Sequence, residues 1–408
     1  MKEWKTYKIR DIATVNLSQY SLKEGWNEVT YLDTGSITEN HIEDIQTFIL
    51  PCDDFPSRAR RKVQHNDILF STVRPNQKHF GILKNPNDNL LVSTGFSVIT
   101  VNPLVADANF VYYYITQQEI INYLQSVAEQ SVSAYPSLKS SDIEDIDIEL
   151  PSLYEQRRLA LILKSIDDKI ENNNRINHNL EQQAQALYKS WFVDFEPFRN
   201  GKFVESELGM IPEGWDAKPL SSICHIEKKT INPQKHPTCL FTHYSIPAYD
   251  NSELPELQKG SDILSNKYII SDYTILFSKL NPRIKRIWNV YKSESNPICS
   301  TEFVVYKPMD IDTYPFLYSF ITGDDFYNNI MSKVNGATGS HQRFHPEETL
   351  DILVPYHIDC YRLYSQLVLP IIQQIDENKR ENHYFASLRD SLLPKLMSGE
   401  LKINDLTC

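Results

Sequence analysis

Hydrophobic residues follow one pattern in the first 150 residues and a second pattern after it. Up to Pro151 they form short runs broken by Asn, Asp, Gly and Pro, as strands and turns do. From Pro151 to Trp191 they recur at steps of three and four residues, which predicts one helix of roughly 60 Å. Because Ser152 and Glu155 match a capping box, this helix is predicted to begin beside them.

Both patterns return in the second half of the chain, at an offset of 204 to 211 residues. Any strand-rich domain contains runs of Ile, Leu and Phe, so a single match would carry little weight. Five matches in the same order are hard to obtain by chance and indicate an internal duplication. The matching segments are Trp4 with Trp215, 68–71 with 275–278, Pro75 with Pro282, 93–96 with 300–303, and 146–151 with 350–355.

The duplication predicts an α+β fold in which a mixed α/β domain and a long helix each occur twice, related by a pseudo-twofold repeat. Within the mixed domains, helices are expected at 109–128 and 314–334. The second long helix contains Pro370 and Pro394, so it is expected to be kinked or shorter than the first. The predicted boundaries are 1–150 for the first mixed domain, 151–198 for the central helix, 199–355 for the second mixed domain and 356–408 for the C-terminal helix.

Two asparagines occupy matching positions on the apolar seam of each long helix. Asparagine on such a seam lowers stability but fixes the register between helices, so we predict that the two helices pair with each other. The alternative is that these asparagines face solvent on helices that pack only against their own domains. The predicted seam is Ile166, Ile170, Asn173, Asn177, Leu180 and Leu187 on the central helix, with Ile375, Asn378, Asn382, Phe385 and Leu392 on the C-terminal helix.

The composition is that of a folded protein, with 41% hydrophobic and 23% charged residues. Because 53 Asp and Glu outnumber 41 Lys and Arg, the chain as a whole is not a basic nucleic-acid coat. No apolar run approaches the roughly 18 to 20 residues of a membrane helix, and the first residues lack the apolar core of a secretion signal. We therefore expect a cytoplasmic protein that does not contact a membrane.

Basic residues nevertheless gather at equivalent places in the two halves. Residues 58–86 include seven basic residues and one acidic residue, and residues 279–292 include five basic and no acidic residues. A charge cluster alone is usually a solvated face, but recurrence in both halves of an acidic chain favours nucleic acid, since Arg and Lys neutralise phosphates. The candidate contacts are Arg58, Arg60, Arg61, Lys62, Arg74, Gln77, Lys78, His79, Lys279, Arg283, Lys285 and Arg286.

Polar loops before the last strand of each half form a second candidate surface. The two halves differ most within the basic segments, where Arg74 corresponds to Asn281 and Gln77 to Ile284. Two similar scaffolds with different contact residues would read two different short sequences, at a separation set by the helices. The candidate residues in the loops are Tyr135, Lys139, His341, Gln342 and Arg343.

No catalytic motif accompanies these features. The chain has no Gly-rich phosphate loop, no Pro-Pro and hence no base-methylation motif of the Asn-Pro-Pro-Tyr type, no His-Glu-x-x-His and no Gly-x-Ser-x-Gly. Cys224, His225, Cys239 and His243 could surround zinc, but their spacing matches no standard site, and no metal is predicted. These absences favour a binding protein over an enzyme.

Segment 150–160, Leu-Pro-Ser-Leu-Tyr-Glu-Gln-Arg-Arg-Leu-Ala, resembles the Pro-x-x-x-Glu-Gln-x-x-Ile start of a central helix in the specificity subunits of type I restriction–modification systems. Segments 187–195, 211–215 and 393–401 are similar to the same family, so the resemblance covers nearly the whole chain. The second copy departs from the pattern because no Glu-Gln follows Pro355, which leaves the start of the second helix open.

The resemblance implies two target-recognition domains, separated by two antiparallel helices, that read a bipartite target in double-stranded DNA. It implies a host-defence complex with two methyltransferase subunits, which use S-adenosylmethionine for DNA methylation at adenine N6, and with restriction/translocase subunits that use ATP and Mg²⁺. The chain itself would hold no catalytic residue and no cofactor. Two alternatives stay open, a coiled-coil scaffold without DNA specificity, which the acidic net charge favours, and a stand-alone DNA-modifying enzyme.

Overall fold

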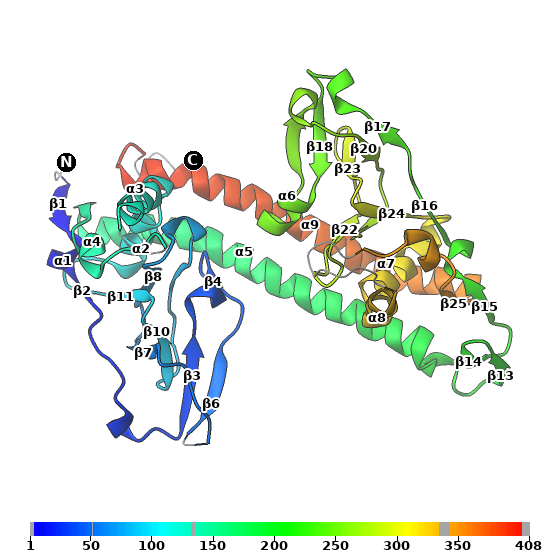
Figure 1. The fold of residues 1–408 in the computed structure, drawn as a ribbon, viewed down its shortest axis with the longest axis horizontal. Helices are drawn as coiled ribbons and strands as arrows, with labels where there is room; N and C mark the ends of the chain where they lie inside the picture. Colours follow the sequence, from blue (N-terminus) through cyan, green and yellow to red (C-terminus); the bar gives the residue numbers. More distant parts are fainter. Residues whose placement is uncertain (1–3, 51, 132–134, 334–342, 402–408) are drawn as a thin grey trace. The chain divides into compact units, whose positions relative to one another are not determined.

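A computed structural model describes residues 4–50, 52–131, 135–333 and 343–401. The chain forms two compact units, unit 1 with residues 1–170 and 384–408, and unit 2 with residues 171–383. Two long helices, α5 (Leu153–Tyr188) and α9 (Ile358–Met397), contribute residues to both units (Figure 1). Because the division falls inside these helices, the four consecutive segments predicted from the sequence stay a prediction.

Unit 1 contains two four-stranded sheets and a ladder that joins its first and last strands. The elements are β1 (Lys5–Lys8), α1 (Ile9–Ile12), β2 (Ala13–Val15), β3 (Glu28–Leu32), β4 (Ile37–Thr38), β5 (His41–Ile42), β6 (Gln46–Ile49), β7 (Ala59–Lys62), β8 (Ile68–Ser71), β9 (Phe80–Ile82), β10 (Leu90–Ser93), β11 (Phe96–Val101) and β12 (Asp147–Leu150). One sheet has the order β2-β11-β8-β9 and the other β6-β3-β10-β7, in which β3 and β10 are parallel. Strands β1 and β12 pair antiparallel, so they close the unit.

Unit 2 repeats the topology of both sheets and of the ladder, with one strand added at a sheet edge and with a hairpin that has no counterpart in unit 1. Its elements are β13 (Phe203–Ser206), β14 (Gly209–Pro212), β15 (Asp216–Pro219), β16 (Cys224–Ile226), β17 (Thr230–Ile231), β18 (Leu240–Tyr244), α6 (Ile246–Ser252), β19 (Glu256–Lys259), β20 (Lys267–Ile269), β21 (Thr274–Ser278), β22 (Ile287–Val290), β23 (Pro297–Ser300), β24 (Phe303–Pro308) and β25 (Leu353–Tyr356). The sheets have the orders β16-β24-β21-β22 and β17-β20-β23-β18-β19, with β18 and β23 parallel. Strands β15 and β25 form the closing ladder, β17 is the added strand, and β13 and β14 form the hairpin. The predicted α+β fold with an internal repeat is confirmed.

The helices within the mixed domains are shorter than the sequence pattern indicated. They are α2 (Ala108–Ile115), α3 (Gln118–Glu129) and α4 (Ser140–Glu144) in unit 1, with α7 (Tyr314–Thr322) and α8 (Asp324–Ser332) in unit 2. The first break follows Thr116, because Gln117 has an extended backbone, and the second lies at Gly323, which is also extended. The helical stretches predicted near 109–128 and 314–334 are thus present, but each consists of two helices, since apolar spacing alone does not show where a helix changes direction. Residue 334 lies outside the described residues.

The long helices are continuous. Helix α5 is followed by a π-helical turn, Lys189–Val193, and Ser152 Oγ accepts a hydrogen bond from the Glu155 N–H at 3.3 Å. Helix α9 has 40 residues against 36 in α5, so the expectation that prolines shorten it is wrong. Pro370 and Pro394 are exposed, which lets water bind carbonyls that a proline leaves unpaired. No helix in the described part of the chain is long and apolar enough to cross a membrane.

In unit 1 the start of α5 and the end of α9 complete one hydrophobic core. Leu159 and Leu163 of α5 and Leu396 of α9 are buried with the apolar faces of α2 and α3. Farther along, Asp167 accepts a hydrogen bond from the Tyr113 hydroxyl at 2.6 Å and pairs with Arg389 at 3.0 Å. The two helices are therefore antiparallel here, and both are attached to the mixed domain.

In unit 2 the corresponding core is aromatic. Phe192 lies in the turn that follows α5. Its ring centroid is 5.0 Å from that of Tyr364 in α9 and 4.8 Å from that of Phe316 in α7, and both pairs are edge to face. Tyr364 donates to the carbonyl of Ala184 at 3.3 Å, so α9 also contacts the backbone of α5. Edge-to-face contacts between buried rings stabilise a core by about 0.5–1.5 kcal/mol each beyond the burial of their area.

Buried asparagines join the two long helices within unit 2. Asn173 Nδ2 donates to Asn382 Oδ1 at 2.8 Å, and Asn378 Nδ2 donates to Asn177 Oδ1 at 2.7 Å. Asn173, Asn177 and Asn378 are at most 6% exposed, so their amides depend on partners within the protein. Of the other seam positions, Ile166 and Ile375 are buried, and the half-buried ones are Ile170, Leu180, Leu187, Phe385 and Leu392.

We expect Asn378→Leu to lower the free energy of unfolding by about 1–3 kcal/mol, because it leaves Asn177 Oδ1 buried without a donor. The double variant Asn177→Leu/Asn378→Leu is expected to recover most of this loss, since Asn177 Oδ1 is no longer present and Gln374, which donates to Asn378, is exposed and can bind water instead. Urea denaturation measures the free energy of unfolding of the single and the double variant. Asn172→Leu, at an exposed position of α5, the helix of Asn177, is the control and should change the free energy by less than about 0.5 kcal/mol. A double variant less stable than Asn378→Leu would contradict the pairing.

Candidate nucleic-acid interface

The turn between β10 and β11 is the centre of the candidate surface in unit 1. The Thr94 N–H donates to the Arg58 carbonyl at 2.9 Å, and the Thr94 carbonyl accepts from Arg61 Nη2 at 3.2 Å. On the other side, the Thr72 N–H donates to the Gly95 carbonyl at 2.8 Å. A Cβ at Gly95 would lie 2.8 Å from the side chain of Thr34, so in unit 1 this neighbour leaves too little room for a side chain at the position. Basic strand β7 and the loop after β8 therefore meet at one turn.

The polar loop before β12 joins the same surface. The Arg74 N–H donates to the Pro136 carbonyl at 3.0 Å, and Val73 and Ser137 form an antiparallel bridge. The Arg74 guanidinium lies over the Tyr135 ring, 4.8 Å from its centroid. The two surfaces that the sequence indicated separately are thus one, which we call the Thr94 edge. It consists of Arg58, Arg61, Thr72, Arg74, Thr94, Gly95 and Tyr135.

The cations around the Thr94 edge differ in how they are paired. Lys62 is bound by Glu24 and Lys78 by Glu39, so their charges are balanced within the protein. Arg58, Arg61 and Arg74 have no carboxylate partner among the residues that the structure describes. Cations without a partner are the ones that a phosphate or a base acceptor would neutralise.

Arg61 is the most constrained of these cations. Its Nε and Nη1 atoms are buried and have no hydrogen-bond acceptor in the described part of the chain. Burial lowers the pKa of its guanidinium, although an arginine stays charged. Because buried donors without acceptors cost free energy, an incoming acceptor at this position would be stabilised.

Four other predicted contacts lie in the same part of unit 1. Arg60 Nε donates to the Ser57 carbonyl at 3.1 Å, and His79 Nδ1 lies 2.7 Å from the Ile37 carbonyl oxygen. Gln77 is exposed on the turn that follows Arg74. Lys139 is exposed and precedes α4.

Unit 2 has the same turn with different side chains. The Lys279 N–H donates to the Glu302 carbonyl at 2.8 Å, as Thr72 does to Gly95 in unit 1. The Glu302 carboxylate accepts from Nε and Nη2 of Arg343, both at 3.2 Å. Burial is the main cause of a lowered pKa for Lys279. We call Lys279, Thr301, Glu302 and Arg343 the Glu302 edge. The predicted residues His341 and Gln342 lie outside the described residues.

Arg286 is not a surface residue, which corrects its assignment as a DNA contact. It is 8% exposed, and its Nε and Nη2 donate to the two carboxylate oxygens of Asp250 at 2.6 and 2.9 Å. Lys285 donates to the Thr322 carbonyl at 2.6 Å and lies 3.6 Å from Asp324. Of the cations in this segment, Arg283 is exposed. The sequence could not distinguish these roles, because Asp250 lies 36 residues away.

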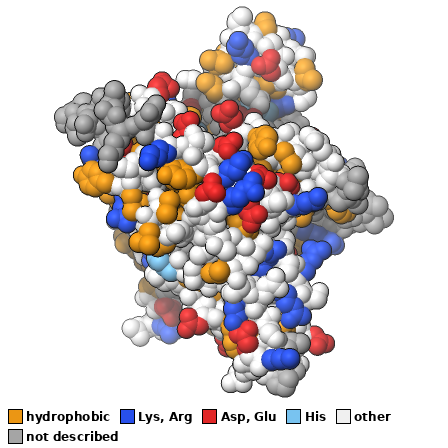
Figure 2. All heavy atoms as spheres, turned by 90° about the vertical axis from the view of Figure 1, so that its left-hand side faces the viewer, with side chains coloured by type: hydrophobic (Ala, Val, Ile, Leu, Met, Phe, Trp, Pro, Cys, Tyr) orange, Lys and Arg blue, Asp and Glu red, His pale blue; other side chains and the backbone are white. Residues whose placement is uncertain are grey.

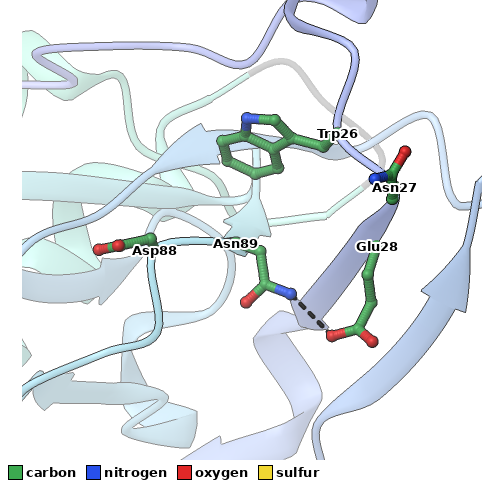
Figure 3. A pocket seen from close by; sticks show the side chains of 5 residues that line it. All are labelled: Trp26, Asn27, Glu28, Asp88 and Asn89. Atoms are coloured by element: carbon green, nitrogen blue, oxygen red, sulfur yellow. Dashed lines mark hydrogen bonds between the residues drawn. The ribbon is translucent and has the colours of Figure 1, made fainter.

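A shallow hollow lies at the opposite end of the parallel strands of unit 1 (Figure 3). Trp26 lines it from the loop before β3, and Asn89, before β10, donates to Glu28 at 2.9 Å across its floor. The remaining lining residues are Asn27 and Asp88. Because Glu28 and Asp88 are acidic, the hollow would repel a phosphate and does not belong to the candidate interface.

Charge alone does not outline an interface on the molecule. Figure 2 shows Lys and Arg side chains interspersed with Asp and Glu on the face drawn, without a continuous basic field. In the described part of the chain no three His, Cys, Asp or Glu residues are placed to hold a metal ion. The candidate interface is therefore outlined by the hydrogen-bonded turns, whose sequence signal is the repeated Ser-Thr pair at 93–94 and 300–301.

The fold and its two edges define a protein with two similar mixed α/β modules joined by a pair of antiparallel helices. Residues 1–182 match the family model for the type I restriction modification DNA specificity domain. The chain is 33% identical to the HindI specificity subunit of Haemophilus influenzae, with 98% of this chain and 100% of that protein covered. It therefore belongs to the specificity subunits of type I restriction enzymes.

Two further similarities agree with this family. The MjaIX specificity subunit of Methanocaldococcus jannaschii is 28% identical over 99% of this chain and 95% of that protein. The S subunit of the type I restriction–modification system from M. genitalium has the same fold, with a TM-score of 0.56 and 16% identity, and 96% of each chain is covered.

We expect Arg286→Ala to lower the free energy of unfolding by about 2–3 kcal/mol, because it leaves the Asp250 carboxylate without its charged donor. Arg283→Ala removes an exposed cation from the same segment and is the matched control, with an expected change below about 0.5 kcal/mol. Thermal unfolding of the two variants side by side measures the difference. Equal stability of the two variants would make Arg286 a candidate surface contact again.

Proposed function

We propose that the chain reads a bipartite target in double-stranded DNA, one part at the Thr94 edge and the other at the Glu302 edge. The observation that carries this proposal is the shared turn. Both units hold the turn by the same backbone hydrogen bond of 2.8 Å, while Gly95 in one corresponds to Glu302 in the other. Two units with the same backbone and different side chains can read two different sequences. The reason is that phosphate contacts position a protein, while side chains at base edges specify the sequence.

The chemical groups at the two edges differ, which supports recognition of a different DNA sequence by each edge. The Thr94 edge presents arginines without carboxylate partners in the described part of the chain, which suit phosphates and guanine. At the Glu302 edge a carboxylate and a guanidinium lie side by side, and a carboxylate accepts hydrogen bonds from cytosine N4. The two half-sites would therefore differ in sequence.

The chain is proposed to act as the non-catalytic subunit of a larger complex. Family membership supports assembly with two methyltransferase subunits, which would use S-adenosylmethionine to methylate adenine, and with restriction/translocase subunits that would use ATP and Mg²⁺. The acidic net charge of −12 fits this arrangement, since partner subunits would supply part of the contact with the DNA backbone.

The double variant Arg58→Ala/Arg61→Ala is expected to weaken binding of the methyltransferase complex to its target. For every phosphate that the variant no longer neutralises, the slope of log K against log salt should also fall by about 0.9. Fluorescence anisotropy at several salt concentrations measures both quantities. The control is Lys62→Ala/Lys78→Ala, which removes two cations that are already paired with carboxylates and should change the slope less. If the slopes of both variants equal that of the unchanged chain, the Thr94 edge does not contact phosphates.

Exchange of residues 1–150 for the same part of another family member should change one half of the target and leave the other half unaltered. The reason is that unit 1 and unit 2 each have their own sheets and their own core. Sequencing that detects methylated adenine in cells carrying each version gives the target directly. A change in both halves would contradict the assignment of one half-site to each unit, and an unspecific pattern with the unchanged chain would contradict the proposed function.

A further inference from the structure

Two basic residues of unit 1 have a backbone conformation that such residues rarely adopt. Arg74 and Lys78 flank the turn Pro75–Gln77 and have φ values of +49° and +57°. The left-handed region is disfavoured for residues with a long side chain and is tolerated best by Gly, Asn and Asp. In unit 2 the residue that corresponds to Arg74 is Asn281, with φ of +47°. The duplication thus kept the backbone, while unit 1 has a residue that is poorly suited to it.

The side chain of Arg74 differs from that of Lys78 in what it contacts. Lys78 is bound to Glu39, so its charge is used within the protein. The Arg74 guanidinium lies over the Tyr135 ring, with its carbon 4.8 Å from the ring centroid, and none of the described residues accepts a hydrogen bond from it. Tyr135 is 60% exposed, so this stack lies at the surface. An aromatic ring under a guanidinium fixes the plane of its donors.

We propose that Arg74 determines specificity by donating two hydrogen bonds to O6 and N7 of one guanine in the half-site read by unit 1. The inference rests on the proposed function and names a residue that performs it. Two parallel donors in a fixed plane match the edge of guanine, which is the commonest partner of arginine in the major groove. Tyr135 is a positioning residue, because it holds the guanidinium and does not itself contact the base.

A phosphate contact explains the geometry less well. A phosphate binds a cation from many directions, so neither the strained backbone nor the stacked ring would be needed for it. Arg58 and Arg61 of the same edge have negative φ values and no carboxylate partner in the described part of the chain. They are therefore the better candidates for contacts with phosphates. The exposed neighbours Asn76 and Gln77 are uncharged and suit base edges.

The test uses the full chain in complex with its methyltransferase subunits and compares Arg74→Asn with Lys78→Asn. Both substitutions remove a cation from the same turn and place asparagine at a left-handed position, so both should raise the melting temperature or leave it unchanged. Adenine-methylation mapping should show that Arg74→Asn accepts other bases at one former guanine, in one half of the target only. Lys78→Asn should keep the target of the unchanged chain.

Binding to synthetic duplexes quantifies the effect. The unchanged complex should prefer guanine at that position by roughly 10- to 100-fold, and Arg74→Asn should reduce the preference to about one. Tyr135→Ala should reduce it partly, whereas Tyr135→Phe keeps the ring and should restore it. If Tyr135→Phe and Tyr135→Ala show the same preference for guanine, the positioning role of Tyr135 is overturned.

Three results would overturn the role of Arg74. One is a target of the unchanged chain without guanine in either half. Another is a target that Arg74→Asn leaves unaltered. The third is that Arg74→Asn lowers the affinity equally for all four bases while its melting temperature is not lowered. If the slope of log K against log salt also falls by about one, Arg74 is a phosphate contact. Methylation without a sequence-specific target by the unchanged complex would instead refute the proposed function, so the two failures are distinguishable.

Discussion

The pairing of amides inside an apolar helix seam is the constraint on which the rest of this structure depends. Asn177 and Asn378 are buried, and the hydrogen bond from Asn378 to Asn177 forms only if α5 and α9 are antiparallel and in one register. A shift of either helix by one turn would leave buried polar groups unpaired, which costs more than the mean gain from a hydrogen bond. Both helices also complete the cores of the two units, so this register is compatible with both cores.

Duplication explains how one backbone can present two chemistries. The two sheets, the closing ladder and the turn between consecutive strands recur in each unit, and one backbone hydrogen bond of 2.8 Å holds the turn in both. Side chains at the turn are free to differ, because the fold is held by the buried strands behind it. Gly95 and Glu302 show the result, since one turn leaves its cations without carboxylate partners among the described residues and the other binds Arg343. Substitutions at the turn can therefore change which DNA sequence a unit recognises without changing its fold.

The residues that could be predicted from the sequence are those whose role depends on spacing alone. The positions of Asn173, Asn177, Asn378 and Asn382 on a seam follow from steps of three and four residues, and the strands before Pro151 and Pro355 follow from alternation. The roles of the basic residues could not be predicted in this way. Arg283 and Arg286 are three residues apart in a segment of one charge, yet one is exposed and the other is buried against Asp250.

The sequence by itself determined the duplication, the α+β class and the family, because repeated motifs and periodic apolar positions are properties of the order of residues. Only the tertiary structure decided which of the described cations remain without a carboxylate partner, that the loop containing Tyr135 lies beside Arg74, and that the turn at Thr94 joins the two predicted surfaces. Those facts depend on contacts between segments tens of residues apart. Such contacts are set by the pairing of whole strands and helices, and no local pattern encodes them.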